Sequence, residues 1–147
     1  MNDSKNNIII DRGDIRCPIA AASAVLTDQW SVIVLRDIAF FGQRTFRDII
    51  SNNNEQIPSS TLAKRLKRLV DVGLLRFEGD ETHSQRKIYC LTIAGIELVP
   101  LIINMAAWSG KHNIFDAHTI DFLQPFQQKN NLALEEFVEK LKTEHLN

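Results

Sequence analysis

The sequence predicts a mainly α-helical fold that carries one small β-hairpin and ends in a helical extension. Three observations predict it. Apolar residues recur at helical spacing in several separate stretches, and two short alternating stretches rich in β-formers lie close together mid-chain. Apolar residues make up 44% of the 147 positions and charged residues 24%, which are ordinary values for a chain with one buried core.

The N-terminal third predicts a loose segment and two helices. Residues 1–15 are polar, and we expect a flexible segment there. Cys17-Pro18 opens a first helix that runs to about Leu26, because proline is well tolerated in a first helical turn. A second helix starts near Thr27 and is stopped by Gly42, with apolar residues at helical spacing: Trp30, Ile33, Val34, Ile38 and Phe41.

Two further helices follow. Thr45 to Ile50 predicts a short third helix or a turn. Ser59 or Ser60 is expected to cap a fourth helix that runs to about Val72. Gly73 then ends it, because glycine commonly adopts the left-handed conformation after a helix.

The periodicity then changes from helical to alternating. Leu74–Glu78 and Lys87–Leu91 alternate and are rich in β-formers, and the segment between them, G-D-E-T-H-S-Q-R, is polar and prone to turn. This pattern predicts a β-hairpin with a long eight-residue loop.

The C-terminal part is helical again. Thr92 caps a long apolar helix, in which Pro100 should produce a kink or a break. A last amphipathic helix covers about Leu132 to His145, with an apolar stripe that must be buried, either against the long helix or across a dimer. The stripe consists of Leu134, Phe137, Val138 and Leu141.

The order of these elements is that of a winged helix-turn-helix. On the fourth helix the leucines gather on one side, and the other side carries hydroxyls and cations with no carboxylate before Asp71. An α-helix fits the DNA major groove, arginine can donate two hydrogen bonds to guanine, and hydroxyls suit phosphates. The residues that we expect to contact DNA from this helix are Ser59, Ser60, Thr61, Lys64, Arg65, Lys67 and Arg68.

The charge distribution agrees with this interpretation. The chain has a net charge of −1, yet residues 43–90 carry nine Lys or Arg against six acids, and residues 121–147 carry five acids against three lysines. A near-neutral average therefore hides a basic middle. The hairpin adds Arg86 and Lys87, and we expect Arg86 to reach a narrow minor groove. A solvated cationic face and an ordinary exposed loop are the alternative readings of these two features.

Several marks, in order, resemble the HxlR-type winged helix-turn-helix transcriptional regulators over about residues 16–110. They are Cys17-Pro18, Trp30, Leu35-Arg36-Asp37, Phe46, L-A-K-R-L-K-R-L followed by G-L-L, Arg86, Tyr89-x-Leu91-Thr92, Gly95 and Trp108. The resemblance implies a domain over residues 16–111, with residues 112–147 as a C-terminal extension. It also implies a cytoplasmic homodimer that binds a pseudo-palindromic double-stranded DNA operator, with the first and the long helix as the dimer interface.

The sequence departs from the family at three places. Gly is usual near Asp28, so we expect a different turn before Trp30. Pro58 stands where a capping serine is common, and residues beyond about 112 extend past the family's usual end.

The two cysteines are interpreted separately. Several members of the family use the cysteine at the position of Cys17 to sense electrophiles or oxidants, and a helix N-terminus favours the reactive thiolate. Packing as a small apolar residue is the alternative for Cys17. Cys90 is interpreted as a strand residue, and two cysteines fit a reducing cytoplasm.

Other functions find no support in the residues. The four histidines, His83, His112, His118 and His145, lack ligand spacing, so we predict no metal and no cofactor. No phosphate loop or catalytic motif occurs, so we predict no enzyme, and we expect no apolar run long enough to span a membrane. Arg36 and Asp37 are expected either to pair within the fold or to touch a phosphate, with a structural role favoured for Asp37. We therefore predict a repressor with an unidentified effector, and the alternative is a winged-helix module for protein interaction.

Overall fold

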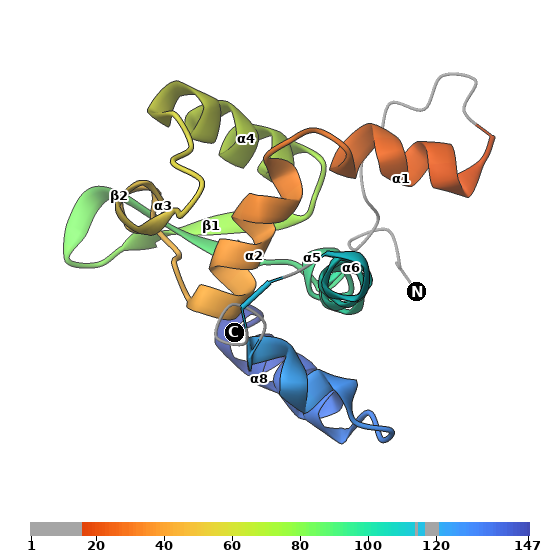
Figure 1. Ribbon diagram of the computed structural model, residues 1–147. Coiled ribbons are helices and arrows are strands. Elements are labelled where there is room, and N and C mark those ends of the chain that lie inside the picture. The colour runs from red at the N-terminus through yellow and green to blue at the C-terminus, as the bar shows by residue number, and fades with distance from the viewer. Residues whose placement is uncertain (1–15, 114, 117–120) are drawn as a thin grey trace.

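The computed structural model describes residues 16–113, 115–116 and 121–147, so the predicted flexible segment 1–15 lies outside the described residues (Figure 1). The elements follow the predicted order and confirm a mainly helical fold with one hairpin. They are α1 (Pro18–Leu26), α2 (Ser31–Phe41), α3 (Phe46–Asn52), α4 (Ser59–Asp71), β1 (Leu75–Asp80), β2 (His83–Leu91), α5 (Ile93–Ile96), α6 (Val99–His112), η2 (Asp121–Gln127) and α8 (Leu132–His145).

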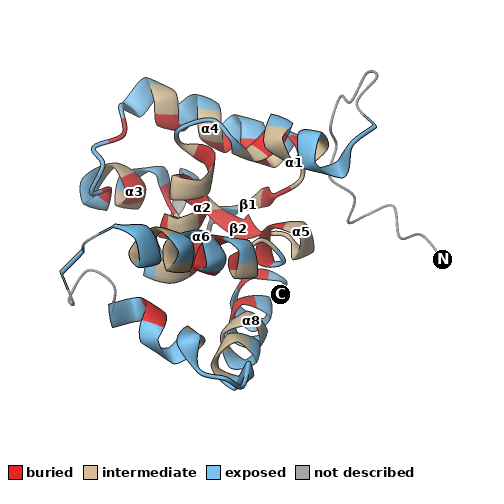
Figure 2. Cartoon of the chain, turned by 45° about the vertical axis from the view of Figure 1, so that its right-hand side comes forward, coloured by how far each residue is buried: buried red, intermediate tan, exposed pale blue. Residues whose placement is uncertain are grey.

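Helix α2 is the central element of the core. It packs against α1, α3, α4, α6 and β2, and more than half of its residues are buried (Figures 1 and 2). Gly42 ends it with a φ of 63°, a left-handed conformation that glycine adopts without strain, as predicted. This central position means that α2 fixes the helices on either side of it relative to one another.

Helices α3 and α4 form the helix-turn-helix pair. The hydroxyl of Thr45 caps α3 by accepting from the Asp48 N–H at 3.1 Å. Helix α4 buries Leu62, Leu66 and Leu69. It ends just before Gly73, whose φ of 92° is positive. The expectation that Ser59 or Ser60 caps α4 is wrong: Pro58 occupies the cap position, where it offers no side-chain acceptor, and both serines lie inside the first turn.

The predicted eight-residue hairpin loop is also wrong. Strands β1 and β2 pair antiparallel up to Asp80 and His83, so only two residues separate them. The polar residues of the predicted loop extend the ladder through their backbones, which apolar alternation does not reveal. The register shifts between Gly79, opposite Lys87, and Asp80, opposite His83, so β2 bulges at residues 84–86.

The long apolar helix is broken, as Pro100 suggested. Thr92 caps α5 by accepting from the Gly95 N–H at 3.2 Å, which confirms the predicted cap. The break falls at residues 97–98, and Pro100 lies in the first turn of α6, where it needs no hydrogen-bond partner.

Residues 93–112 also test the expectation about membranes. By length and composition this stretch could cross a bilayer, because its most apolar part has a mean hydropathy of 1.4 and only 28% of that part is buried. The expectation that no apolar run is long enough to span a membrane is therefore wrong. Its residues Val99, Ile102 and Ile103 belong to the core of the domain and lie on the helix that contacts α2. The inner face of this stretch is therefore part of the fold.

The C-terminal extension packs on the core at the end away from α4 (Figures 1 and 2). Helix α8 has the predicted bounds and contacts α5, β2 and η2, whereas η2 contacts α6. Phe40 of α2 stacks on Phe137 at 5.0 Å between ring centroids and meets Phe122 and Phe126 edge-on. Within one chain, Leu141 of the apolar stripe is thus buried and the other three residues are partly buried against the core, where the sequence offered the long helix or a dimer partner.

Candidate nucleic-acid interface

The cationic face of α4 lies open to solvent. Ser59, Ser60, Lys64, Lys67 and Arg68 are exposed, whereas Thr61 and Arg65 are half-buried. Figure 1 places this helix at the edge of the molecule, and the acidic extension lies at the other end. The first turn has no side-chain cap, so its backbone N–H groups remain available to an acceptor such as a phosphate.

Arg65 is held on the flank of this face by Asp28. Its Nη1 lies 3.5 Å from Asp28 Oδ2. The same carboxylate accepts from the N–H groups of Trp30 at 2.8 Å and Ser31 at 2.9 Å, and from the Ser31 hydroxyl. Burial raises the pKa of the Asp28 carboxyl, but these hydrogen bonds and the charge of Arg65 outweigh it and lower the pKa overall. The departure from glycine at position 28 therefore makes a capped start for α2 and a partner for Arg65.

The other cations of α4 are weakly held. Lys67 pairs with Asp71 at 2.8 Å, but the two side chains are 77% and 57% exposed, so water screens the pair and a competing anion can break it. Within the described residues no carboxylate lies at ion-pair distance from Lys64 or Arg68.

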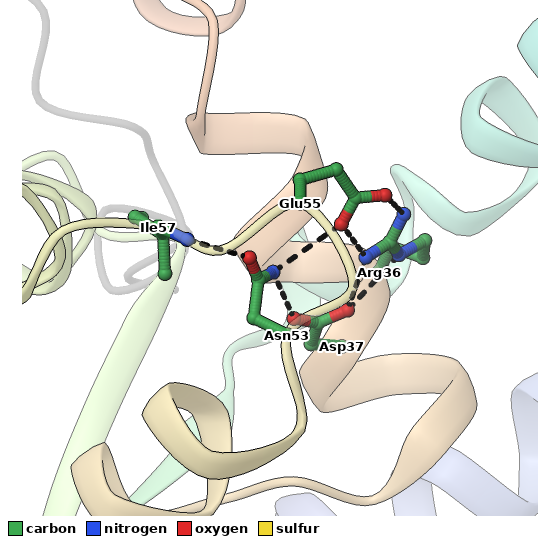
Figure 3. Close-up of polar contacts among 5 residues, drawn as sticks. All are labelled: Arg36, Asp37, Asn53, Glu55 and Ile57. Atoms are coloured by element: carbon green, nitrogen blue, oxygen red, sulfur yellow. Dashed lines mark hydrogen bonds and ion pairs between the residues drawn. The ribbon is translucent and has the colours of Figure 1, made fainter.

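A polar network fixes the turn that leads into α4 (Figure 3). The Asn53 amide donates to Asp37 Oδ2 at 2.9 Å and accepts from the Ile57 N–H at 2.8 Å. Asp37, which is 1% exposed, also pairs with Arg36 at 2.7 Å. This confirms that Arg36 and Asp37 pair within the fold.

Arg36 extends the network to the turn itself. It donates two hydrogen bonds to Glu55, at 2.6 and 2.8 Å. The hydrogen bonds from Arg36 lower the pKa of the Glu55 carboxyl, and those to Glu55 raise the pKa of the guanidinium. Two charged residues of α2 thus hold the turn between α3 and α4, and so set the direction in which α4 leaves the core.

The wing adds cations beside α4. Arg86 and Lys87 are exposed on β2, and Lys87 Nζ lies 4.3 Å from the centroid of the Phe77 ring, a cation–π contact. The base of the hairpin is held to the segment before α3, because the Tyr89 N–H donates to the Arg44 carbonyl at 2.7 Å. The wing is therefore tied to the helix-turn-helix pair.

Two grooves border the wing. One, of about 440 Å³, lies between the start of α3 and β2, and the other, of about 420 Å³, lies between α4 and the hairpin. They share Phe46, Lys87 and Tyr89. The first groove also contains Arg47, a basic residue that the sequence analysis did not single out because a lone arginine on a short helix carries no pattern.

Comparison with known proteins decides the family. The family model of HxlR-like helix-turn-helix proteins matches residues 25–116. The chain belongs to the HxlR-like helix-turn-helix family.

The relatives are named as regulators. This HxlR-like chain is 33% identical over 94 residues to Rv3095 of Mycobacterium tuberculosis, an uncharacterised HTH-type transcriptional regulator, covering 64% of this chain and 58% of that protein. It is 32% identical over 92 residues to sll1512 of Synechocystis, named in the same way, covering 60% and 64%. The chain thus spans less than two thirds of these relatives. It also resembles the crystal structure of PA1607, proposed to be a transcription factor, with a TM-score of 0.64 and 28% identity over 72% of each chain.

The two cysteines of this HxlR-like chain differ in environment. Cys17 is exposed at the cap position of α1, and its thiol makes no capping hydrogen bond. Cys90 is buried in β2, as the strand interpretation predicted; its Sγ accepts from Arg44 at 2.8 Å and donates to Glu78 at 3.2 Å. Burial raises the pKa of the Cys90 thiol, so of the two it is the less suited to reaction.

Proposed function

We propose that this chain is a sequence-specific, DNA-binding transcriptional repressor that acts in the cytoplasm as a homodimer. The observation that supports it most is the open cationic face of α4, beside a basic wing and away from the acidic extension. Membership of the HxlR-like helix-turn-helix family also supports DNA binding.

In this proposal α4 enters the major groove. Lys64, Arg65 and Arg68 face base edges and flanking phosphates, and Thr61 and Lys67 border them. The hydroxyls of Ser59 and Ser60 and the N–H groups of the first turn bind a phosphate, which suits the positive end of the helix dipole. Arg86 reaches the adjacent minor groove, and Lys87 neutralises a phosphate.

The dimer is supported by apolar surface on α1 and α6. Ile19 is 77% exposed and Trp108 67%, and Leu101 and Met105 lie exposed on the same side of α6. Residues of α1 and α6 line one apolar groove together. A surface of this kind marks a protein interface. Two copies joined there would present two α4 helices to a pseudo-palindrome, roughly 34–36 Å apart.

Charge removal on α4 tests DNA binding. Bound genomic fragments are selected first, and the affinity of one such fragment is then measured against salt. Replacing Lys64, Arg65 and Arg68 with Ala should weaken binding and lower the salt slope by up to about 0.9 per lost phosphate contact. The matched control replaces Lys140 and Lys142 of α8, which lie on the extension.

Unchanged affinity in the α4 variant would count against the proposal. If the wild type binds selected fragments no better than bulk DNA, the alternative of a protein-interaction module is favoured. Size determination in solution tests the dimer, and Trp108→Glu should yield monomers because it places a charge in the apolar surface.

We also propose that Cys17 makes DNA binding responsive to oxidants. Its exposure and its position at the start of α1, next to Pro18 of the proposed dimer surface, support this role. A mild oxidant should release DNA from the wild type but not from Cys17→Ser. Release that persists in Cys17→Ser would remove the sensing role and leave DNA binding untouched.

A further inference from the structure

The groove between α3 and the wing combines cations with aromatic rings. It has a volume of about 440 Å³, and its lining includes Phe46, Arg47, Gln85, Arg86, Lys87 and Tyr89. The three cations come from two elements, α3 and β2, and no carboxylate among the described side chains contributes to the lining. A surface that contacts only water does not need cations and aromatic rings at the same place, so this combination suggests a ligand.

Each feature favours a different part of a ligand. Arg47 makes no ion pair with any described residue, and a guanidinium matches the two oxygens of a carboxylate with two parallel hydrogen bonds. Phe46 is 37% exposed although it is large and apolar, and it lines the groove, so part of its side chain can contact the ring of a ligand.

We propose that this groove binds a small aromatic acid, with the carboxylate on Arg47 and Arg86 and the ring against Phe46 and Tyr89. The volume lies within the roughly 300–1,000 Å³ of small-ligand sites. A DNA phosphate would use the cations but has no need of the rings, which makes the aromatic requirement the distinctive part of the proposal.

The position of the groove gives the ligand a consequence for regulation, and this consequence rests on the proposed function. The groove shares Phe46, Lys87 and Tyr89 with the second groove, which opens between α4 and the hairpin. A bound acid would neutralise the wing cations that we propose contact DNA and would lie next to the groove that borders α4, so DNA should be released as the acid binds.

The test measures binding of benzoate to the full chain without DNA, by calorimetry and by the shifts of backbone amides. Benzoate should bind saturably and shift amides of α3 and β2. Acetate, which lacks the ring, and benzamide, which lacks the charge, should each bind at least about tenfold more weakly. If acetate bound as tightly as benzoate, the proposal would be overturned, because the cations alone would then account for binding.

Variants place the ligand. Arg47→Gln and Phe46→Ala should each weaken benzoate binding by about tenfold or more. Arg68→Gln is the matched control, because Arg68 is an exposed arginine that lines neither groove. Thermal melting checks that each variant is folded. No saturable binding, or binding that neither groove variant changes, would overturn the proposal.

The two proposals can fail independently. Because benzoate is titrated without DNA, a chain that binds no DNA can still bind benzoate. Conversely, loss of the benzoate site leaves the affinity of the wild type for selected DNA fragments as a separate measurement.

Discussion

Replacing Asn53 with Ala should destabilise the domain more than any other single polar substitution in the turn before α4. Asn53 is 7% exposed and joins α2 to this turn. Its amide donates to the buried Asp37 carboxylate and accepts from the Ile57 N–H (Figure 3). The alanine variant leaves both groups without that partner.

The magnitude follows from these two contacts. A hydrogen bond to a charged group contributes about 1.5–3 kcal/mol, and a buried N–H left unsatisfied costs about 1–3 kcal/mol. Asp37 keeps its ion pair with Arg36 at 2.7 Å, and water can reach part of the vacated space, so the two terms do not add in full. We expect a loss of about 3 kcal/mol, a large fraction of the roughly 5–15 kcal/mol that stabilises a domain.

Urea unfolding measures this loss. The matched control is Asn54→Ala, the exposed neighbour in the same turn, which should change the free energy of unfolding by no more than about 0.5 kcal/mol. Asn53→Ala should also weaken DNA binding under conditions where it remains folded, because α4 loses part of its anchor. If the two variants unfold alike, the network does not hold the turn as argued.

Two other substitutions give clear signs. Burial and the nearby charges of Arg44 and Arg76 lower the pKa of His145 to about 4, and its Nδ1 accepts from the Leu91 N–H at 2.9 Å. The stability that neutral His145 contributes is present above pH 6.5 and is lost as pH falls towards 4, which amounts to about 2 kcal/mol between pH 7 and pH 5. His145→Gln should therefore flatten this part of the plot of unfolding free energy against pH, measured with urea. An NMR titration in which His145 itself has a pKa near 6.5 would refute the prediction. Gly95→Ala places a Cβ 2.3 Å from a backbone oxygen and should lower the free energy of unfolding by more than about 2 kcal/mol in the same assay. At Gly110 an added Cβ meets no described atom of this chain within 4 Å, so Gly110→Ala should raise the free energy of unfolding by up to about 1 kcal/mol. Equal effects of the two variants would contradict this reasoning.

The sequence predicts most helices because their apolar spacing is local. Helix α8 has the predicted bounds, and α1 and α4 agree within one residue. In each case a strong apolar stripe meets a recognisable start or stop, such as Pro18 or Gly73. Periodicity and end signals act within a few residues, so they can be read without the fold.

The hairpin shows the limit of predicting structure from local apolar patterns. Its outer half is polar on both strands, and its pairing depends on backbone hydrogen bonds and on a bulge at residues 84–86. Neither leaves an apolar pattern, so the sequence assigns these residues to a loop. The position of Arg86 at the bulge follows only from the register.

The candidate surfaces divide in the same way. The cationic face of α4 follows from one helix and its period, so the sequence supplies it. The network of Asp37 and Asn53 joins residues 16 positions apart, and the groove at Arg47 joins α3 to β2. Contacts of this kind require the tertiary fold, and single residues carry no sign of them.

The C-terminal extension explains how the wing is held from the side opposite to α4. Arg76 donates to the His145 carbonyl of α8, and from the segment before α3 Arg44 adds a hydrogen bond to the Tyr89 carbonyl at 3.1 Å. With the bond from the Leu91 N–H to His145, these contacts fix the inner end of the hairpin, whereas its outer end carries the exposed cations. A wing that is rigid at its base and open at its tip can meet DNA without a large ordering cost, since the extension already supplies the order in the absence of DNA.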